Sequence, residues 1–213
     1  MPTRKDTFEN GNYYHIFDKT IDKKKIFSTD GLCRLFINAA RFYMYDGHKA
    51  SFSKYRHMLS SVKEDYSKDY FVSARVQVRL ICYTLMPNHY HFLLQQTLSG
   101  GVQRFMGNLI NSFTRYFNTR HSRKGPIFLP QFRSVSILRK SQLVYTSKYI
   151  HLNPVKANLV SSIDDLINYP WSSYRAYTGY DVPGFVQCNK VLKHFEYSQS
   201  KYREYLIGNE NAD

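Results

Sequence analysis

The sequence predicts a mixed α+β fold in which helices cover one face of an antiparallel sheet. Three observations support this class. The 213 residues are enough for one domain, and 43% of them are hydrophobic, which is enough for a normal core. Segments with strand-like and helix-like hydrophobic patterns also follow one another in the order β-α-β-β-α-β, and one further helical segment comes after the last strand.

The first strand and the first helix are expected near the N-terminus. Residues 12–19 (NYYHIFDK) have the composition of a strand. Residues 28–30 can cap a helix, because apolar side chains recur after them at helical spacing: Leu32, Leu35, Phe36, Ala39, Ala40 and Tyr43. Residues 46–72 are polar and rich in Tyr, which predicts a loop with one short helix.

A pair of antiparallel strands is expected next. Val76, Val78, Leu80 and Cys82 occupy alternate positions of a strand that runs to about residue 85. A tight break at Met86-Pro87-Asn88 separates this strand from a second one at residues 89–96 (HYHFLLQQ).

A second helix, a strand and a final helix complete the pattern. The second helix is expected from its apolar positions: Val102, Phe105, Met106, Leu109, Ile110, Phe113 and Phe117. A basic loop at residues 121–130 leads to a strand at 132–138 and a helix from 141 to about 153. This order is that of the ferredoxin-like, split βαβ fold, whose second sheet face stays available for a site or a further helix.

The chain is expected to form one domain over residues 1–180 and a short helical tail over 181–213. Three distant cysteines, Cys33, Cys82 and Cys188, exclude a disulfide framework and a CxxC zinc site. No apolar run approaches the roughly 18 residues of a transmembrane helix, and the first residues are polar. The prediction is a cytoplasmic protein with reduced thiols and no membrane partner.

Positive charge is concentrated in one half of the chain. The net charge is +14, yet residues 70–163 contain no Asp or Glu. This acid-free segment holds twelve cations: Arg75, Arg79, Arg104, Arg115, Arg120, Arg123, Lys124, Arg133, Arg139, Lys140, Lys148 and Lys156. The net charge by itself could be explained by a solvated basic surface. The concentration of twelve cations in a segment without acidic residues favours a polyanionic partner.

Two histidines lie within this acid-free segment. His89 and His91 are two residues apart on a predicted strand, so their rings share one face while Tyr90, Phe92 and Leu94 face the helices. Side-by-side imidazoles can bind a divalent cation. Such a pair is often only a surface feature, but its position directly after a tight turn favours a metal site.

A third ligand must be neutral or come from outside the acid-free segment. In the last helix, Tyr149 and Asn153 are four residues apart and share a helix face. Asn153 offers an amide oxygen to a cation, and Tyr149 offers a phenol. His151 is expected to point elsewhere, and Pro154 is expected to end or kink the helix near Asn153.

These residue types fit phosphodiester transesterification. A phenol with a pKa of about 10 is a weak nucleophile at neutral pH, so a divalent cation would be needed to polarise the phosphate and to offset charge in the transition state. The tyrosine would become joined to the phosphate, which keeps the bond available for a second transfer. Tyr145, one turn earlier, is a rival nucleophile, and packing explains most of the 19 tyrosines.

Two blocks of the sequence resemble a known family. MPNHYHFLL (86–94) and KYIHLNPVKANLV (148–160) look like the signature blocks of the REP-associated tyrosine transposases, which belong to the single-tyrosine HUH transposases. YYHIFDK, FLPQFRSVSIL and YPWSSYRAYTG are similar as well, so the resemblance covers roughly residues 12–180 in the family's order.

The resemblance implies an HUH-type fold and a single-stranded DNA endonuclease and strand transferase. The expected substrate forms a hairpin, and the reaction passes through a 5′-phosphotyrosine intermediate with a free 3′-OH. It implies Mg²⁺ or Mn²⁺ as cofactor, His89 and His91 as metal ligands, Tyr149 as nucleophile and Asn153 in the place of a polar third ligand. Relatives occur as monomers and as dimers, so a homodimer stays an open alternative.

The chain departs from the family pattern before the last predicted strand. The family usually has a Gly-Arg pair where this chain has Pro130-Gln131-Phe132-Arg133, so no role is carried over to Gln131, while Arg133 keeps a basic residue there. Contacts with the DNA backbone are expected from nine cations: Arg115, Arg120, Arg123, Lys124, Arg133, Arg139, Lys140, Lys148 and Lys156.

An alternative function is a non-catalytic, domesticated protein that binds DNA or RNA hairpins on the same scaffold. Dependence on a divalent metal discriminates the two functions, because only the enzyme must lose activity in a chelator. A zinc protein using histidines and cysteines is disfavoured, because no cysteine lies within a few residues of His89.

Overall fold

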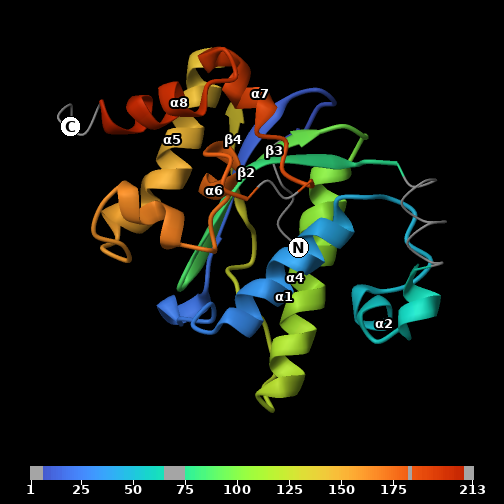
Figure 1. Ribbon diagram of the computed structural model, residues 1–213. Coiled ribbons are helices and arrows are strands. Elements are labelled where there is room, and N and C mark those ends of the chain that lie inside the picture. The colour runs from blue at the N-terminus through green and yellow to red at the C-terminus, as the bar shows by residue number, and fades with distance from the viewer. Residues whose placement is uncertain (1–6, 65–74, 182–183, 209–213) are drawn as a thin grey trace.

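Four antiparallel strands form one sheet in the order β2-β3-β1-β4 (Figure 1). The computed structural model describes residues 7–64, 75–181 and 184–208. The strands are β1 (Tyr13–Lys19), β2 (Val78–Met86), β3 (His89–Gln96) and β4 (Arg133–Ile137). β3 lies between β1 and β2 and is antiparallel to both, so β1 and β2 run parallel, as in a split βαβ unit. The predicted α+β class is confirmed.

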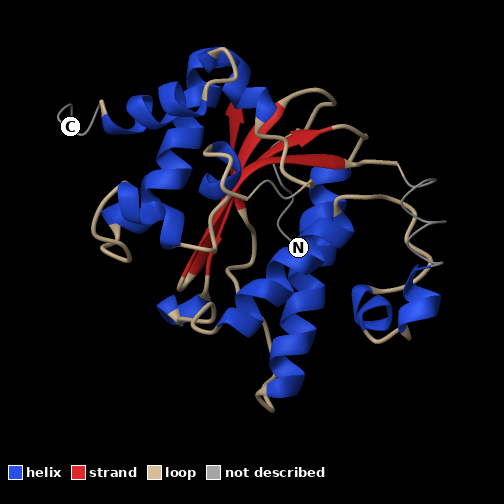
Figure 2. Ribbon diagram, viewed as in Figure 1, coloured by secondary structure: helices blue, strands red, loops and turns tan. Residues whose placement is uncertain are grey.

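Helices lie on both faces of this sheet (Figure 2). α1 (Asp30–Tyr43) and α4 (Gly101–Arg120) cover one face, and α5 (Lys140–Lys156) crosses the other. The remaining elements are short: η1 (Ile21–Lys23), α2 (Phe52–Arg56), η2 (Asp164–Asn168), α6 (Tyr174–Tyr177), α7 (Asn189–Leu192), η3 (Lys193–Phe195) and α8 (Gln199–Ile207). The face that the sequence left open for a further helix is thus occupied by α5.

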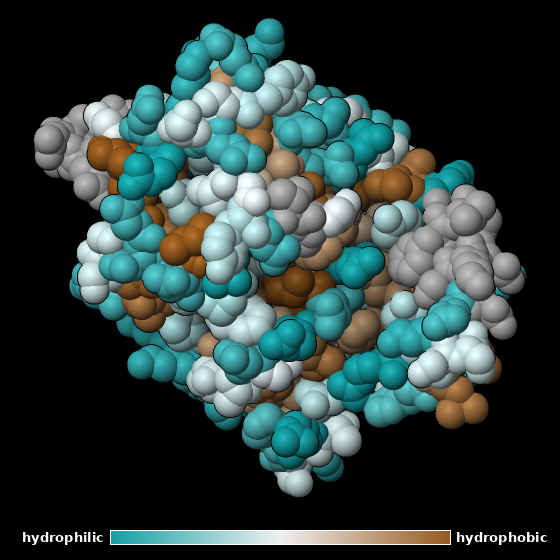
Figure 3. Space-filling model, in the orientation of Figure 1, coloured by the Kyte–Doolittle hydropathy of each residue, from teal (hydrophilic) through white to brown (hydrophobic). Residues whose placement is uncertain are grey.

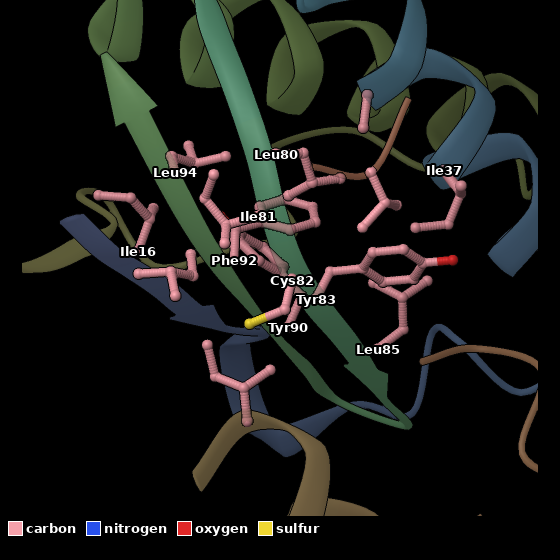
Figure 4. Close-up of a cluster of buried hydrophobic side chains, with 14 of the residues drawn as sticks. Ile16, Ile37, Leu80, Ile81, Cys82, Tyr83, Leu85, Tyr90, Phe92 and Leu94 are labelled. Carbon is pink, nitrogen blue, oxygen red and sulfur yellow. The ribbon is translucent and has the colours of Figure 1, made fainter. Parts of the chain in front are cut away.

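Aromatic rings dominate the core between the sheet and the helices α1 and α4. The ring of Phe36 in α1 lies 5.2 Å from that of Tyr90 and 6.0 Å from that of Phe92, both on β3. In Figure 4, Ile37 extends from α1 toward Tyr83 of β2. Most of the apolar mass is buried in this way, and the face in Figure 3 shows apolar residues only as small areas among hydrophilic ones.

The register of β2 differs from the expected alternation. Leu80 pairs with Leu94, but Cys82 pairs with Leu93, because a β-bulge interrupts the ladder between Leu80 and Cys82. Successive residues of β3 face opposite sides of the sheet, so Leu80 and Cys82 do as well. The prediction that Leu80 and Cys82 share one face is wrong. The extra residue in the bulge reverses the sheet face to which each later residue of β2 points.

Local signals at the first helix and in the loop after it agree with the structure. α1 begins after Thr29, whose hydroxyl accepts a hydrogen bond from the Leu32 amide. The short helix expected within residues 46–72 is α2, and residues 65–72 of that segment lie outside the described part of the chain.

All three cysteines are free thiols and are buried. In the ranges that the structure describes, no helix is long and apolar enough to span a bilayer.

α5 continues through Pro154 to Lys156, so the helix does not end near Asn153. Pro154 has no N–H to donate to the carbonyl of Ile150, four residues earlier. The hydroxyl of Thr84 on β2 donates to this carbonyl instead, at 2.9 Å. The sheet therefore supplies the hydrogen bond that proline removes, and the same bond fixes the helix on the sheet.

The C-terminal segment packs on the outer side of α5. The phenol of Tyr202 in α8 is 2.7 Å from Nδ1 of His151, and the Lys148 ammonium donates to the carbonyl of Tyr205 at 2.8 Å. Tyr202 and Leu206 are fully buried in the same core as the sheet. His151 therefore has a packing role, and the division of the chain at residue 180 stays a prediction.

Replacing Thr84 by Val should lower the free energy of unfolding by about 1–3 kcal/mol, because the buried carbonyl of Ile150 loses its donor. Chemical denaturation measures this cost. In a Pro154→Ala background the restored amide can donate to the same carbonyl, so Thr84→Val should cost less there. An equal cost in both backgrounds would show that the hydroxyl acts elsewhere.

Candidate active site

Three histidines gather on the sheet face beneath α5. His89 and His91 come from β3, and their ring centroids are 5.1 Å apart. His15 comes from the neighbouring strand β1, and its ring stacks on that of His91 with centroids also 5.1 Å apart. His91 is only 5% exposed, so the site lies in the crevice between helix and sheet rather than on an open surface.

Tyr149 reaches this histidine group from α5. Its ring meets His91 and His15 edge-on, with centroids at 5.6 and 5.8 Å. Its side chain is 36% exposed, so a substrate can reach the phenol. Tyr145, one turn earlier, is 59% exposed, and among the described residues its ring contacts none of the three histidines. The geometry therefore favours Tyr149 over Tyr145 as the residue that acts with the histidines.

Asn153 lies one turn after Tyr149 on the same helix face. Its side-chain Nδ2 donates to the carbonyl of Tyr149 at 2.7 Å. This bond holds the amide group against the helix and leaves Oδ1 as the atom that can bind a cation.

Burial keeps all three rings neutral. It lowers the pKa of His91 to about 2, with further contributions from His15, His89 and Lys19. Burial lowers the pKa of His15 and of His89 to about 4, and the Lys19 charge adds to the effect on His89. Neutral imidazole is the form that coordinates a metal, so the environment suits ligand histidines.

No carboxylate from the described part of the chain completes a metal site with this group. Asp18 is the nearest acidic residue along β1, but it lies three residues from His15 and so faces the opposite side of the sheet. Across the described residues, no three His, Cys, Asp or Glu side chains are arranged to hold a metal. His89 and His91, with the amide oxygen of Asn153 one turn after Tyr149, are the neutral groups that could hold a cation here.

Three of the predicted DNA-contacting cations lie on the side of the sheet that α5 covers, and two of them, Arg139 and Lys140, are at the start of α5, about 14 Å along the helix from Tyr149. Arg133 pairs with Phe17 across β4 and β1, and the Phe17 ring stacks on His91 at 5.7 Å. Arg139 is the N-cap of α5 and Lys140 is its first residue, and both are exposed. These three, Arg133, Arg139 and Lys140, are called the site-side cations below.

The other predicted cations are distributed differently. Arg115 and Arg120 are exposed on α4, which covers the opposite sheet face, and Lys124 is exposed in the loop after it. Arg123 donates to Asn118 Oδ1 and to the carbonyls of Gly125 and Pro126, so it braces this loop. Lys148 is buried with its ammonium on the Tyr205 carbonyl, and exposed Lys156 is the last residue of α5.

Sequence reasoning missed two residues of this site. His15 is one, because only its pairing neighbour on β3 places it beside His91. The predicted split βαβ topology contained this signal, since it puts the first strand next to the strand of His89 and His91. Lys19 is the other, and its charge acts on both of these histidines.

Comparison with known proteins finds a matching family profile and a solved structure with a similar fold. The family profile described as "Transposase IS200 like" matches residues 43–153, just over half of the chain. A solved structure of a REP-associated tyrosine transposase bound to a REP hairpin superposes with a TM-score of 0.56. The match covers 88% of this chain and 90% of that chain at 13% identity, a likeness of fold. No curated protein matches the sequence.

Asp18→Asn should stabilise the protein at pH 8 and change little at pH 4. Burial raises the pKa of Asp18 to about 7, so the folded state favours the neutral acid, and this contribution is lost as pH rises from about 4 to 7. The asparagine stays neutral, so its gain in unfolding free energy should reach about 1–3 kcal/mol at pH 8. Denaturation at both pH values measures it, and a pH-independent difference would contradict the buried acid.

Proposed function

Because the chain belongs to the IS200-like transposase family, we propose that it is a metal-dependent HUH endonuclease and strand transferase for single-stranded, hairpin-forming DNA. The observation that carries this proposal is the contact of Tyr149, on α5, with His91 and His15, on the sheet. A tyrosine and neutral histidines are thus brought together from three separate elements, in a crevice flanked by cations.

In the proposed reaction, Tyr149 is the nucleophile. Its phenolic oxygen forms a bond with phosphorus as the phenol proton passes to water, and the bond to the 3′ oxygen breaks. The leaving oxygen takes up a proton to give a free 3′-OH, and the 5′ phosphate stays on the tyrosine. Attack of a second 3′-OH on this phosphotyrosine would reverse the chemistry and join two strands.

His89, His91 and Asn153 are proposed to hold Mg²⁺ or Mn²⁺, which supplies charge neutralisation at the phosphate. The chain itself contributes the orientation. α5 places Tyr149 against His91 and leaves its side chain exposed enough for a substrate to reach it. Residues 70–163, which include His89, His91, Tyr149 and Asn153, contribute no negative charge against the DNA.

The proposed substrate follows from charge and from the similar structure. That structure is bound to a REP hairpin, and here the site-side cations can contact phosphates near the cleaved bond. We expect the protein to act in the cytoplasm, where such DNA lies. The alternative, a hairpin-binding protein without catalysis, would keep the cations but would need neither Tyr149 nor a metal.

Tyr149→Phe should abolish covalent protein–DNA adducts, because the variant has no phenolic oxygen to bond phosphorus. The assay mixes protein with hairpin oligonucleotides from the DNA flanking its gene, with Mg²⁺ or Mn²⁺, on a denaturing gel. Tyr145→Phe is the matched control and should keep the adduct, while a chelator should remove it. Adduct formation that survives in Tyr149→Phe would move the assignment to another tyrosine.

Neutralising the site-side cations together, as Arg133→Gln, Arg139→Gln and Lys140→Gln, should weaken hairpin binding for all sequences alike. The slope of log affinity against log salt should fall by about 2, since about 0.7 counterions are released per single-strand phosphate.

A control triple on the opposite face carries Arg115→Gln, Arg120→Gln and Lys124→Gln, and it should change the slope less. A larger effect from the control would place the DNA on the α4 side. A change in sequence preference would mean that the site-side cations read bases.

A further inference from the structure

We propose that Asn88 and His15 are positioning residues that fix the tautomers of His89 and His91, so that both rings present Nε2 toward the bound cation. This inference rests on the proposed function for the role of the cation. The tautomers themselves are a property of the protein alone. Neither Asn88 nor His15 would touch the substrate.

The first contact fixes His89. Nδ1 of His89 lies 2.7 Å from Oδ1 of Asn88. An amide oxygen only accepts, so Nδ1 must carry the proton and Nε2 keeps its lone pair. The orientation of the Asn88 amide is consistent with this, because its Nδ2 faces the carbonyl of Lys23 at 3.5 Å. The Asn88 backbone carbonyl accepts from the amide of Thr20 at 2.9 Å, which anchors the residue.

The second contact decides the state of His91. Nδ1 of His91 lies 2.9 Å from Nε2 of His15, and a hydrogen bond of this length has one donor and one acceptor. If His15 donated, neutral His91 would carry its proton on Nε2 and could not bind a cation there. If His91 donates, its Nε2 is free. We infer the second arrangement, because it alone leaves Nε2 of both His89 and His91 free for the proposed cation.

Aromatic packing holds His91 in this orientation. The His91 ring packs beside the rings of His15 and Phe17, whose centroids lie 5.1 and 5.7 Å away at interplanar angles of 26°. The edge of Tyr149 closes a further side. A flip of the His91 ring that exchanged its nitrogen and carbon positions would break the bond to His15, and His91 is only 5% exposed.

The two contacts follow a general rule for metal sites. A ligating histidine usually donates its second ring N–H to a partner, which sets the tautomer and the ring orientation. Here the partners come from two different places, the turn before β3 and the neighbouring strand β1. His15 is also the ring against which Tyr149 rests, so one residue orients a ligand and borders the nucleophile.

The test measures tautomers in metal-free, ¹⁵N-labelled protein by long-range ¹H–¹⁵N spectra. Both His89 and His91 should appear with a protonated Nδ1 and an unprotonated Nε2. His15→Phe keeps an aromatic ring but removes the acceptor, so His91 should lose its single tautomer. His15→Gln offers a carbonyl acceptor and should restore the tautomer at least in part. Asn88→Leu should release His89 and leave His91 unchanged.

Mn²⁺ affinity provides the second readout. His15→Phe should weaken Mn²⁺ binding by about 10–100-fold, the usual cost of losing such a partner, while denaturation shows an intact fold. A wild-type His91 protonated on Nε2, or unchanged Mn²⁺ affinity in folded His15→Phe, would overturn the inference. Wild-type protein with the expected tautomers but no Mn²⁺ binding would instead contradict the proposed function and leave the tautomer assignment standing.

Discussion

The attachment of α5 to the open face of the sheet is the interaction on which the site depends. Tyr149 can meet the histidines only if this helix lies across β2 and β3. The hydroxyl of Thr84 donates to the carbonyl of Ile150 and holds the helix there, one residue from Tyr149. Pro154 has no N–H to donate to this carbonyl. His151 strengthens the attachment, since its ring bonds Tyr202 on one side and Ser173 on the other.

The distribution of charge between α5 and the sheet determines which groups could hold a cation there. Buried imidazoles stay neutral, and the central strands bring no carboxylate to the α5 face, so a cation there would be held by neutral donors alone. Phosphate oxygens of bound DNA would complete the ligand set of such a cation and strengthen its binding. Metal and DNA binding would then support each other, which suits an enzyme that acts only on bound strands.

Much of the fold could be predicted because its signals are local. Alternation placed His89 and His91 on one face and Tyr90 and Phe92 on the other, and helical spacing located α1 and α4. Two features were not local. The bulge in β2 has no marker in the sequence, and the continuation of α5 through Pro154 depends on a hydroxyl that is distant in the chain. His15 was missed for a similar reason, because its role exists only in the pairing of β1 with β3.

The central claim is that the metal ligands and the nucleophile are already assembled in the protein without DNA. Anomalous diffraction from DNA-free crystals soaked in Mn²⁺ tests it most directly. The account predicts one Mn²⁺ ion bound by Nε2 of His89, Nε2 of His91 and Oδ1 of Asn153, with the Tyr149 hydroxyl facing it. A Mn²⁺ ion bound elsewhere, or an α5 that holds Tyr149 away from the histidines, would contradict it.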